Sequence, residues 1–77
     1  MASIHKDQLA ESIGTNIARK CKELNLSQKQ LAHNTGLTEA GISRYISGQR
    51  LPRLDILLKI ATALDCTLEY LLYGVEM

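Results

Sequence analysis

Two cysteines and two histidines are the first residues in this sequence to consider as zinc ligands or as parts of a catalytic group. Cys21 and Cys66 are far apart, and His5 and His33 are each isolated. A zinc site needs paired ligands at short spacing, and nucleophilic catalysis needs a base beside its nucleophile. The sequence also lacks a phosphate-binding glycine loop. It therefore predicts no enzyme, no metal site and no cofactor, and both cysteines are interpreted as buried thiols in a reducing compartment.

The composition indicates one small helical domain. The chain has 77 residues, of which 45% are hydrophobic and 22% charged, and it is rich in Leu and poor in Val. This length is too short for two ordinary domains, and such Leu usage favours helices. Its apolar runs are too short for a membrane span, and its first residues do not resemble a signal peptide. We therefore predict a single all-α domain over residues 1–77, cytoplasmic and without membrane contact.

Apolar periodicity and capping residues predict the first two helices. The first spans about residues 9–24, and Asn25 follows as its stop. The second spans residues 28–35 and begins with a capping box, in which Ser27 and Gln30 satisfy each other's backbone N–H groups. Gly36 supplies the left-handed residue that ends this helix.

Three more helices are predicted after Gly36. One begins at the cap Thr38 and continues through residue 47, before Gly48. The next spans about residues 54–64, and the last follows the cap Thr67 and stops at Gly74. The side chains expected to face the core from these three helices are Ile42, Tyr45, Ile46, Leu54, Leu57, Leu58, Ala61, Leu64, Leu68, Leu71 and Leu72.

The segment from Gln28 to Tyr45 fits two short helices joined by a tight turn. Ala32 is small enough for the two helix axes to cross, and Gly36 supplies positive φ in the turn. Ile42 is placed to anchor the second of the two helices from below. This spacing of Ala, Gly and Ile is what a helix-turn-helix requires.

From about residue 13 to residue 74 the chain resembles the Xre/Cro and phage-repressor (lambda-repressor-like) family of helix-turn-helix regulators. Besides the helix-turn-helix, ISRYISGQRLPRLDILLKIATAL and LEYLLYG follow the family's third helix, loop, fourth helix and fifth helix. The resemblance implies a compact five-helix fold with the helix-turn-helix in helices two and three. Cys21 and Ile46 depart from it, since several members have an ion pair there, and Arg53 stands where Ser or Thr commonly caps the fourth helix.

The resemblance implies that residues 38–47 enter the major groove of double-stranded DNA. Helical spacing agrees, because burial of Ile42, Tyr45 and Ile46 turns positions 39, 40, 43, 44 and 47 outward. Arg44 suits a bidentate contact with guanine O6 and N7. The residues expected to read bases are Thr38, Glu39, Ala40, Ser43 and Arg44.

Other residues are expected to contact the DNA backbone, and some roles stay open. Arg44 as a phosphate contact, and Glu39 as an acid that only complements the helix dipole, are alternatives. Gly41 costs roughly 1 kcal/mol relative to Ala in a helix, and either permits close approach to DNA or reduces crowding. The predicted phosphate contacts are Gln28, Ser47, Arg50 and Arg53.

The end of the chain is predicted to form a two-fold interface between copies. Its apolar residues are too many to face one small core, and family members dimerise through this end. Such a dimer places two reading helices about 34 Å apart on a near-palindromic site. The predicted interface residues are Cys66, Thr67, Tyr70, Leu71, Tyr73 and Val75.

The predicted function is therefore that of a bacterial or phage-encoded, nucleoid-associated transcriptional regulator, most simply a prophage-type repressor that occupies an operator as a homodimer. No small-molecule ligand is expected. The alternative is an interaction module, such as an antitoxin, whose main role is to bind a partner protein.

Charge distribution supports DNA binding although the net charge is only +1. Residues 19–59 contain eight basic and three acidic side chains. Residues 60–77 contain three acidic side chains and no basic one. The positive charge is thus concentrated around the helix-turn-helix, an asymmetry that would orient the protein as it approaches DNA.

Overall fold

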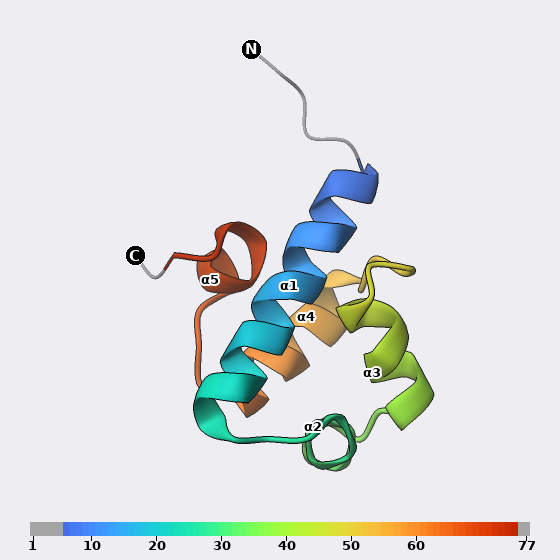
Figure 1. The fold of residues 1–77 in the computed structure, drawn as a ribbon, viewed down its shortest axis with the longest axis vertical. Helices are drawn as coiled ribbons and strands as arrows, with labels where there is room; N and C mark the ends of the chain where they lie inside the picture. The colour runs from blue at the N-terminus through green and yellow to red at the C-terminus, as the bar shows by residue number, and fades with distance from the viewer. Residues whose placement is uncertain (1–5, 76–77) are drawn as a thin grey trace.

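Five helices surround one aliphatic core in the computed structural model, which describes residues 6–75. They are α1 (Lys6–Leu24), α2 (Gln28–Thr35), α3 (Glu39–Ile46), α4 (Leu54–Ala63) and α5 (Leu68–Tyr73). The long helix α1 runs through the middle, with α5 on one side, α3 on the other and α4 behind it (Figure 1). The predicted all-α fold with five helices is confirmed.

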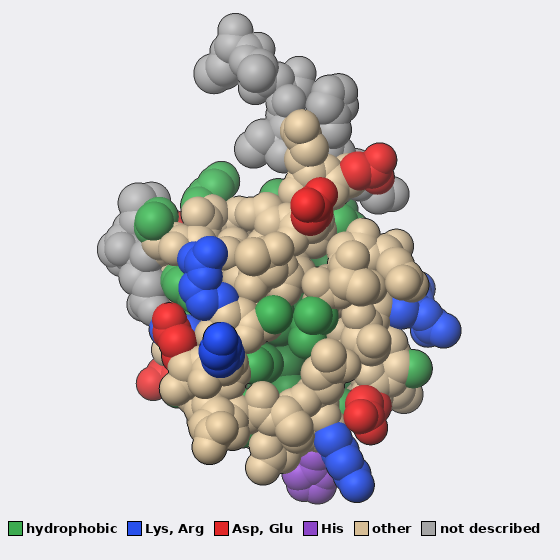
Figure 2. All heavy atoms as spheres, viewed as in Figure 1, with side chains coloured by type: hydrophobic (Ala, Val, Ile, Leu, Met, Phe, Trp, Pro, Cys, Tyr) green, Lys and Arg blue, Asp and Glu red, His purple; other side chains and the backbone are tan. Residues whose placement is uncertain are grey.

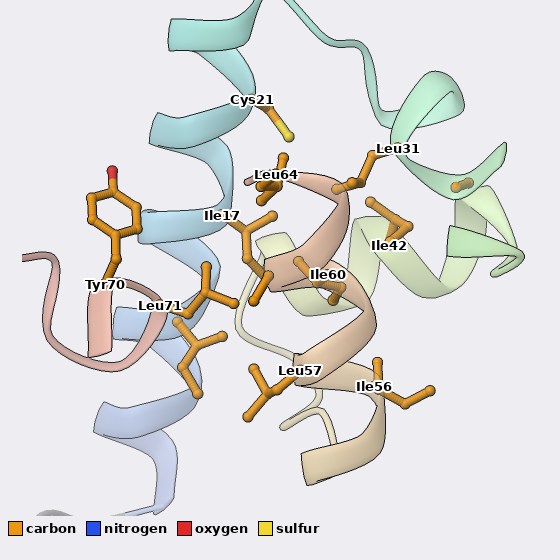
Figure 3. Packing of buried hydrophobic residues seen from close by; sticks show 13 residues of the cluster. Ile17, Cys21, Leu31, Ile42, Ile56, Leu57, Ile60, Leu64, Tyr70 and Leu71 are labelled. Carbon is orange, nitrogen blue, oxygen red and sulfur yellow. The ribbon is translucent and has the colours of Figure 1, made fainter. Parts of the chain in front are cut away.

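The core is aliphatic, as the composition predicts. Figure 3 shows α1, α4 and α5 converging on it, with Leu31 and Ile42 entering from α2 and α3. Each such side chain contributes about 1.5–3 kcal/mol by leaving water. The largest fully buried side chains are Ile13, Ile17, Leu31, Ile42, Ile60, Leu64 and Leu71.

The helix ends follow their local sequence. In the capping box of α2, the Gln30 N–H donates to Ser27 Oγ at 3.0 Å, and the Ser27 N–H donates to Gln30 Oε1 at 2.8 Å. Gly36 ends α2 in the left-handed conformation, with φ of 72°. Asn25 ends α1 in the same way, with φ of 57°. These predicted boundaries are confirmed. They could be predicted from the sequence because capping hydrogen bonds join residues only a few positions apart.

Two other boundaries differ slightly from the prediction. Helix α1 begins at Lys6 rather than near residue 9, and Asp7 in its first turn complements the helix dipole. Helix α3 ends at Ile46, and Ser47 serves as its C-cap. The apolar pattern alone predicts neither boundary. The residues added at the start of α1, and the residue removed from the end of α3, do not belong to the apolar pattern.

The buried face of α4 is rotated from the predicted one. Leu54 and Leu58 are 63% and 48% exposed, so their predicted place in the core is wrong. Ile56 is buried instead, together with Ile60 and other residues of that face. Helix α4 packs against α2 as well as α5. Leu54 and Leu58 are four residues apart and share one side of the helix, which is exposed, whereas Ile56 and Ile60 share the buried side.

Helix α5 is attached to α1 by polar contacts that the sequence pattern did not indicate. Asn16, which is buried, donates from Nδ2 to the carbonyl oxygen of Leu71 at 2.9 Å. Ser12 Oγ donates to the carbonyl oxygen of Leu72 at 3.2 Å. These bonds satisfy carbonyl groups at the C-terminal end of a six-residue helix, which otherwise lack partners.

Candidate nucleic-acid interface

Backbone hydrogen bonds shape the turn between α2 and α3, and the small side chain of Ala32 lets the two helices pack closely. The N–H of Gly36 donates to the His33 carbonyl at 3.3 Å, and that of Leu37 donates to the Ala32 carbonyl at 3.0 Å. Thr35 Oγ1, which is buried, donates to the Leu31 carbonyl at 2.8 Å. Ala32 is itself buried. The turn therefore holds α2 and α3 in a defined relative orientation.

Helix α3 packs against the core mainly through one fully buried side chain, that of Ile42. Ile42 is fully buried, and Tyr45 and Ile46 pack against the same core while remaining partly exposed. Thr38 caps the helix by accepting from the N–H of Gly41 at 3.0 Å. The predicted base-reading residues are all exposed, and they are Thr38, Glu39, Ala40, Ser43 and Arg44.

The C-terminal end of α3 lies directly against α1 at Gly14, a contact that the sequence analysis missed. A Cβ on Gly14 would lie 2.5 Å from the carbonyl oxygen of Tyr45 and closer still to that of Ile46. Real Cβ atoms do not approach a carbonyl oxygen so closely. A glycine facing apolar neighbours inside a predicted helix is the signal that could have indicated this crossing.

Arg44 and Glu39 project from α3 without a charged partner among residues 6–75, where the ion pairs join Lys20 to Glu23 and Arg53 to Asp55. The carbonyl of Arg44 accepts from the N–H of Gln49 at 3.0 Å and from Ser47 Oγ at 3.1 Å. The backbone of Arg44 is therefore held in place while its guanidinium remains available.

The predicted phosphate contacts are likewise exposed. Gln28 is the first residue of α2, and Ser47, Arg50 and Arg53 lie on the segment that joins α3 to α4. Arg53 is the N-cap of α4 but makes no side-chain capping bond. Its guanidinium lies 3.5 Å from the Asp55 carboxylate, in an exposed pair worth little stabilisation. Solvent-exposed arginines of this kind are suited to phosphate binding.

Positive side chains surround an apolar area on the face in Figure 2, standing over α1 and beside α2 and α3. In the same view, acidic side chains lie near α3 and near the N-terminal part of α1. The charge distribution is therefore mixed locally, and the positive balance arises from residues 19–59 taken together.

Two of the positions that depart from the resembled family, Cys21 and Ile46, make apolar contacts with the core. Cys21 is buried in the core cluster, and Ile46 packs against that cluster. Burial raises the pKa of the Cys21 thiol, because the thiolate would lose its hydration. Apolar packing thus occupies the place of an ion pair, a replacement that proteins often tolerate.

The residues predicted for a two-fold interface differ in how exposed they are in the structure. Tyr70 and Leu71 are buried within the protomer, so their predicted place on a free surface is wrong, and Leu71 takes the core position that was also predicted for it. The ring of Tyr70 packs beneath Lys20, whose Nζ lies 4.7 Å from the ring centre. Cys66 and Thr67 are partly exposed. Only Tyr73 and Val75, at 59% and 55%, are well exposed.

The described residues also limit other kinds of site. Residues 6–75 contain no group of three side chains able to hold a metal ion. No helix within this range is both long and apolar enough to cross a membrane.

Comparison with protein families identifies the fold. A family model described as helix-turn-helix matches residues 17–71. The chain belongs to this helix-turn-helix family. The resemblance inferred from the sequence is thereby confirmed, and α2 and α3 are the two helices of the motif. A curated family relative is the cryptic phage CTXphi transcriptional repressor RstR of Vibrio cholerae, 34% identical over 59 residues. The match covers 77% of this chain and 53% of RstR, so the chain spans about half the length of that relative.

Two solved structures are similar to most of this chain. One is the restriction-modification controller protein C.AhdI from Aeromonas hydrophila, with a TM-score of 0.77, 32% identity, and coverage of 80% of this chain and 94% of that one. The other is the P22 c2 repressor in complex with a synthetic operator, with a TM-score of 0.76 and 30% identity. That match covers 82% of this chain and 96% of the repressor.

Proposed function

We propose that this protein is a sequence-specific DNA-binding regulator of transcription, acting as a repressor. The observation that carries the proposal is the exposed face of α3 opposite the buried Ile42, presenting Arg44, which has no charged partner among residues 6–75. The similarity to a repressor solved with its operator supports it. In this proposal α3 lies in the major groove, while Gln28, Arg50 and Arg53 bind phosphates on either side.

Selection of bound sites from a pool of random duplexes tests the proposal. The chain is expected to enrich a short sequence with two-fold symmetry, and to bind it at least 1,000-fold more tightly than random duplex at physiological salt. Failure to retain any duplex, even at low salt, would contradict the proposal and favour a module that binds a partner protein.

Binding to the selected site should weaken steeply as salt is added. If a dimer contacts about six phosphates, log K should fall against log salt concentration with a slope of about −5. The slope arises because each neutralised phosphate releases condensed counterions into solution. Titrations at four or more salt concentrations measure it, and a flat dependence would exclude phosphate contacts of this kind.

We further propose that two copies bind one site through the surface that includes Tyr73 and Val75. Both side chains are exposed at the end of α5, and burying apolar surface there would stabilise a two-fold contact. The neighbouring residues 60–77 carry acidic side chains and no basic one. This end of the chain is therefore better suited to a partner subunit than to phosphate.

Replacing both Tyr73 and Val75 with Glu should convert the dimer to a monomer. Charges on a two-fold axis meet their own copies, so repulsion adds to the loss of apolar contact. Sedimentation at tens of micromolar, with and without operator, measures the change. Leu24→Glu is the matched control, because Leu24 is a comparably exposed apolar residue, at 45%, on α1. A wild-type protein that is monomeric and binds DNA one-to-one would contradict the interface.

A further inference from the structure

Gly41 lies within α3, although the conformation of this helix does not require a glycine. The positive-φ glycines of the described chain are Gly36, Gly48 and Gly74, so Gly41 has an ordinary helical φ. Glycine is less favourable than alanine inside a helix, because it loses more backbone freedom when the helix forms. Its presence in an eight-residue helix therefore calls for a steric explanation.

Packing within the protein does not supply that explanation. Apart from its chain neighbours and the backbone of its own helix, a Cβ on Gly41 would meet one atom of the described residues within 4 Å, which is Thr38 Oγ1 at 3.0 Å. Gly14 is a clear contrast, because a Cβ there would press against backbone carbonyls. Beyond the Thr38 hydroxyl, no other part of residues 6–75 outside the neighbouring turn of α3 occupies the space above Gly41.

The Thr38 contact does not require a glycine either. Gly41 is the third residue of its helix, and its N–H donates to the N-cap hydroxyl at 3.0 Å. Gln30 and Tyr70 hold the same position in α2 and α5, and their N–H groups also donate to an N-cap hydroxyl at 3.0 Å. Both carry full side chains. The capping geometry of this protein therefore accommodates a Cβ at the third position.

Helix α3 also gives up a second stabilising contact by having glycine here. In α2, the side chain of Gln30 accepts a hydrogen bond from the Ser27 N–H, which completes the capping box. Gly41 has no side chain with which to do the same for Thr38. The N-terminal half of α3 is thus less stabilised than its neighbour and bare of side-chain atoms at this position.

We propose that Gly41 is a positioning residue for DNA binding, because it allows the α3 backbone to lie against the DNA. This inference rests on the proposed function. Gly41 is partly exposed, follows the exposed Ala40, and lies one turn before Arg44. A methyl group at this position would hold the helix away from the groove. A displacement of about 1 Å lengthens a hydrogen bond from roughly 2.9 to 3.9 Å, beyond bonding distance.

Gly41→Ala separates this role from a structural one, because the two effects have opposite signs. Without DNA, the variant should be more stable, with an unfolding equilibrium constant up to about fivefold lower in urea titrations. Its affinity for the selected operator should fall at least tenfold, and its preference for operator over random duplex should fall with it. Thr62→Ala is the matched control, since Thr62 is an exposed residue of α4 and should leave both binding values unchanged.

Two results would overturn the inference while leaving the proposed function intact. One is a Gly41→Ala variant that binds operator with wild-type affinity and preference. The other is a variant that is less stable than wild type without DNA, since this would assign the glycine to its contact with Thr38. If wild type binds no duplex, the proposed function fails and the inference fails with it.

Discussion

Replacing Arg44 with Ala should weaken binding to the selected operator by about 1–3 kcal/mol, or roughly 5- to 150-fold. Arg44 is exposed on α3, and its carbonyl is fixed by the N–H of Gln49 and by Ser47 Oγ. Its guanidinium has no charged partner among residues 6–75 to compete with a base. Because each copy loses two parallel hydrogen bonds to guanine, one position in each half of the selected sequence should become degenerate.

The pattern of loss distinguishes a base contact from a phosphate contact. Arg44→Lys keeps the charge but loses the planar fork, so it should also lose preference at that position. Arg50→Ala is the control, because Arg50 is an exposed arginine of the loop after α3. It should weaken operator and random duplex alike and reduce the salt slope by about 1 per copy, or about 2 for the dimer. Equal losses on both kinds of DNA for Arg44→Ala would make Arg44 a phosphate contact.

Replacing Gly14 with Ala should lower the free energy of unfolding by about 1–3 kcal/mol or more. The added methyl would collide with the carbonyl oxygens of Tyr45 and Ile46. These are backbone atoms of the last two residues of α3, so they cannot move away by a change of side-chain rotamer. The end of α3 must shift away from α1, and apolar contacts around Ile42 loosen with it.

Urea unfolding followed by circular dichroism measures this loss. Thr15→Ala is the matched control, since Thr15 is the next residue of α1 and is exposed. Its stability should be unchanged or slightly higher, because alanine favours helices. Where Gly14→Ala remains folded, its operator affinity should fall as well, since α1 sets the position of α3. Wild-type stability in Gly14→Ala would contradict the close crossing of the two helices.

The candidate DNA-binding site is a case in which the sequence carries most of the information. The caps Ser27 and Thr38 and the turn residue Gly36 define where α2 and α3 begin and end. With Ile42 buried, helical geometry decides which side chains of α3 point outward. The structure places those side chains in solvent as expected. Their contacts with DNA stay predictions.

The interface predicted between copies was wrong in part, because Tyr70 and Leu71 of α5 are buried. The six residues of α5 include Leu and Tyr at nearly every position, so the pattern does not distinguish a buried face from an exposed one. Burial was decided by α1, where Asn16 and Ser12 bind the carbonyls of Leu71 and Leu72. This attachment turns Tyr70 inward and leaves Tyr73 in solvent.

The end of α1 at Asn25, both ends of α2, the turn and the outward face of α3 can all be read from the sequence alone. Those features depend on hydrogen bonds and periodicity within a few residues, which are the same whatever else the chain does. The burial of Ile56 rather than Leu54, and the crossing of α1 and α3 at Gly14, depend on how the helices pack together. Such contacts join residues far apart in the chain, and they depend on which neighbouring helix arrives and at what angle.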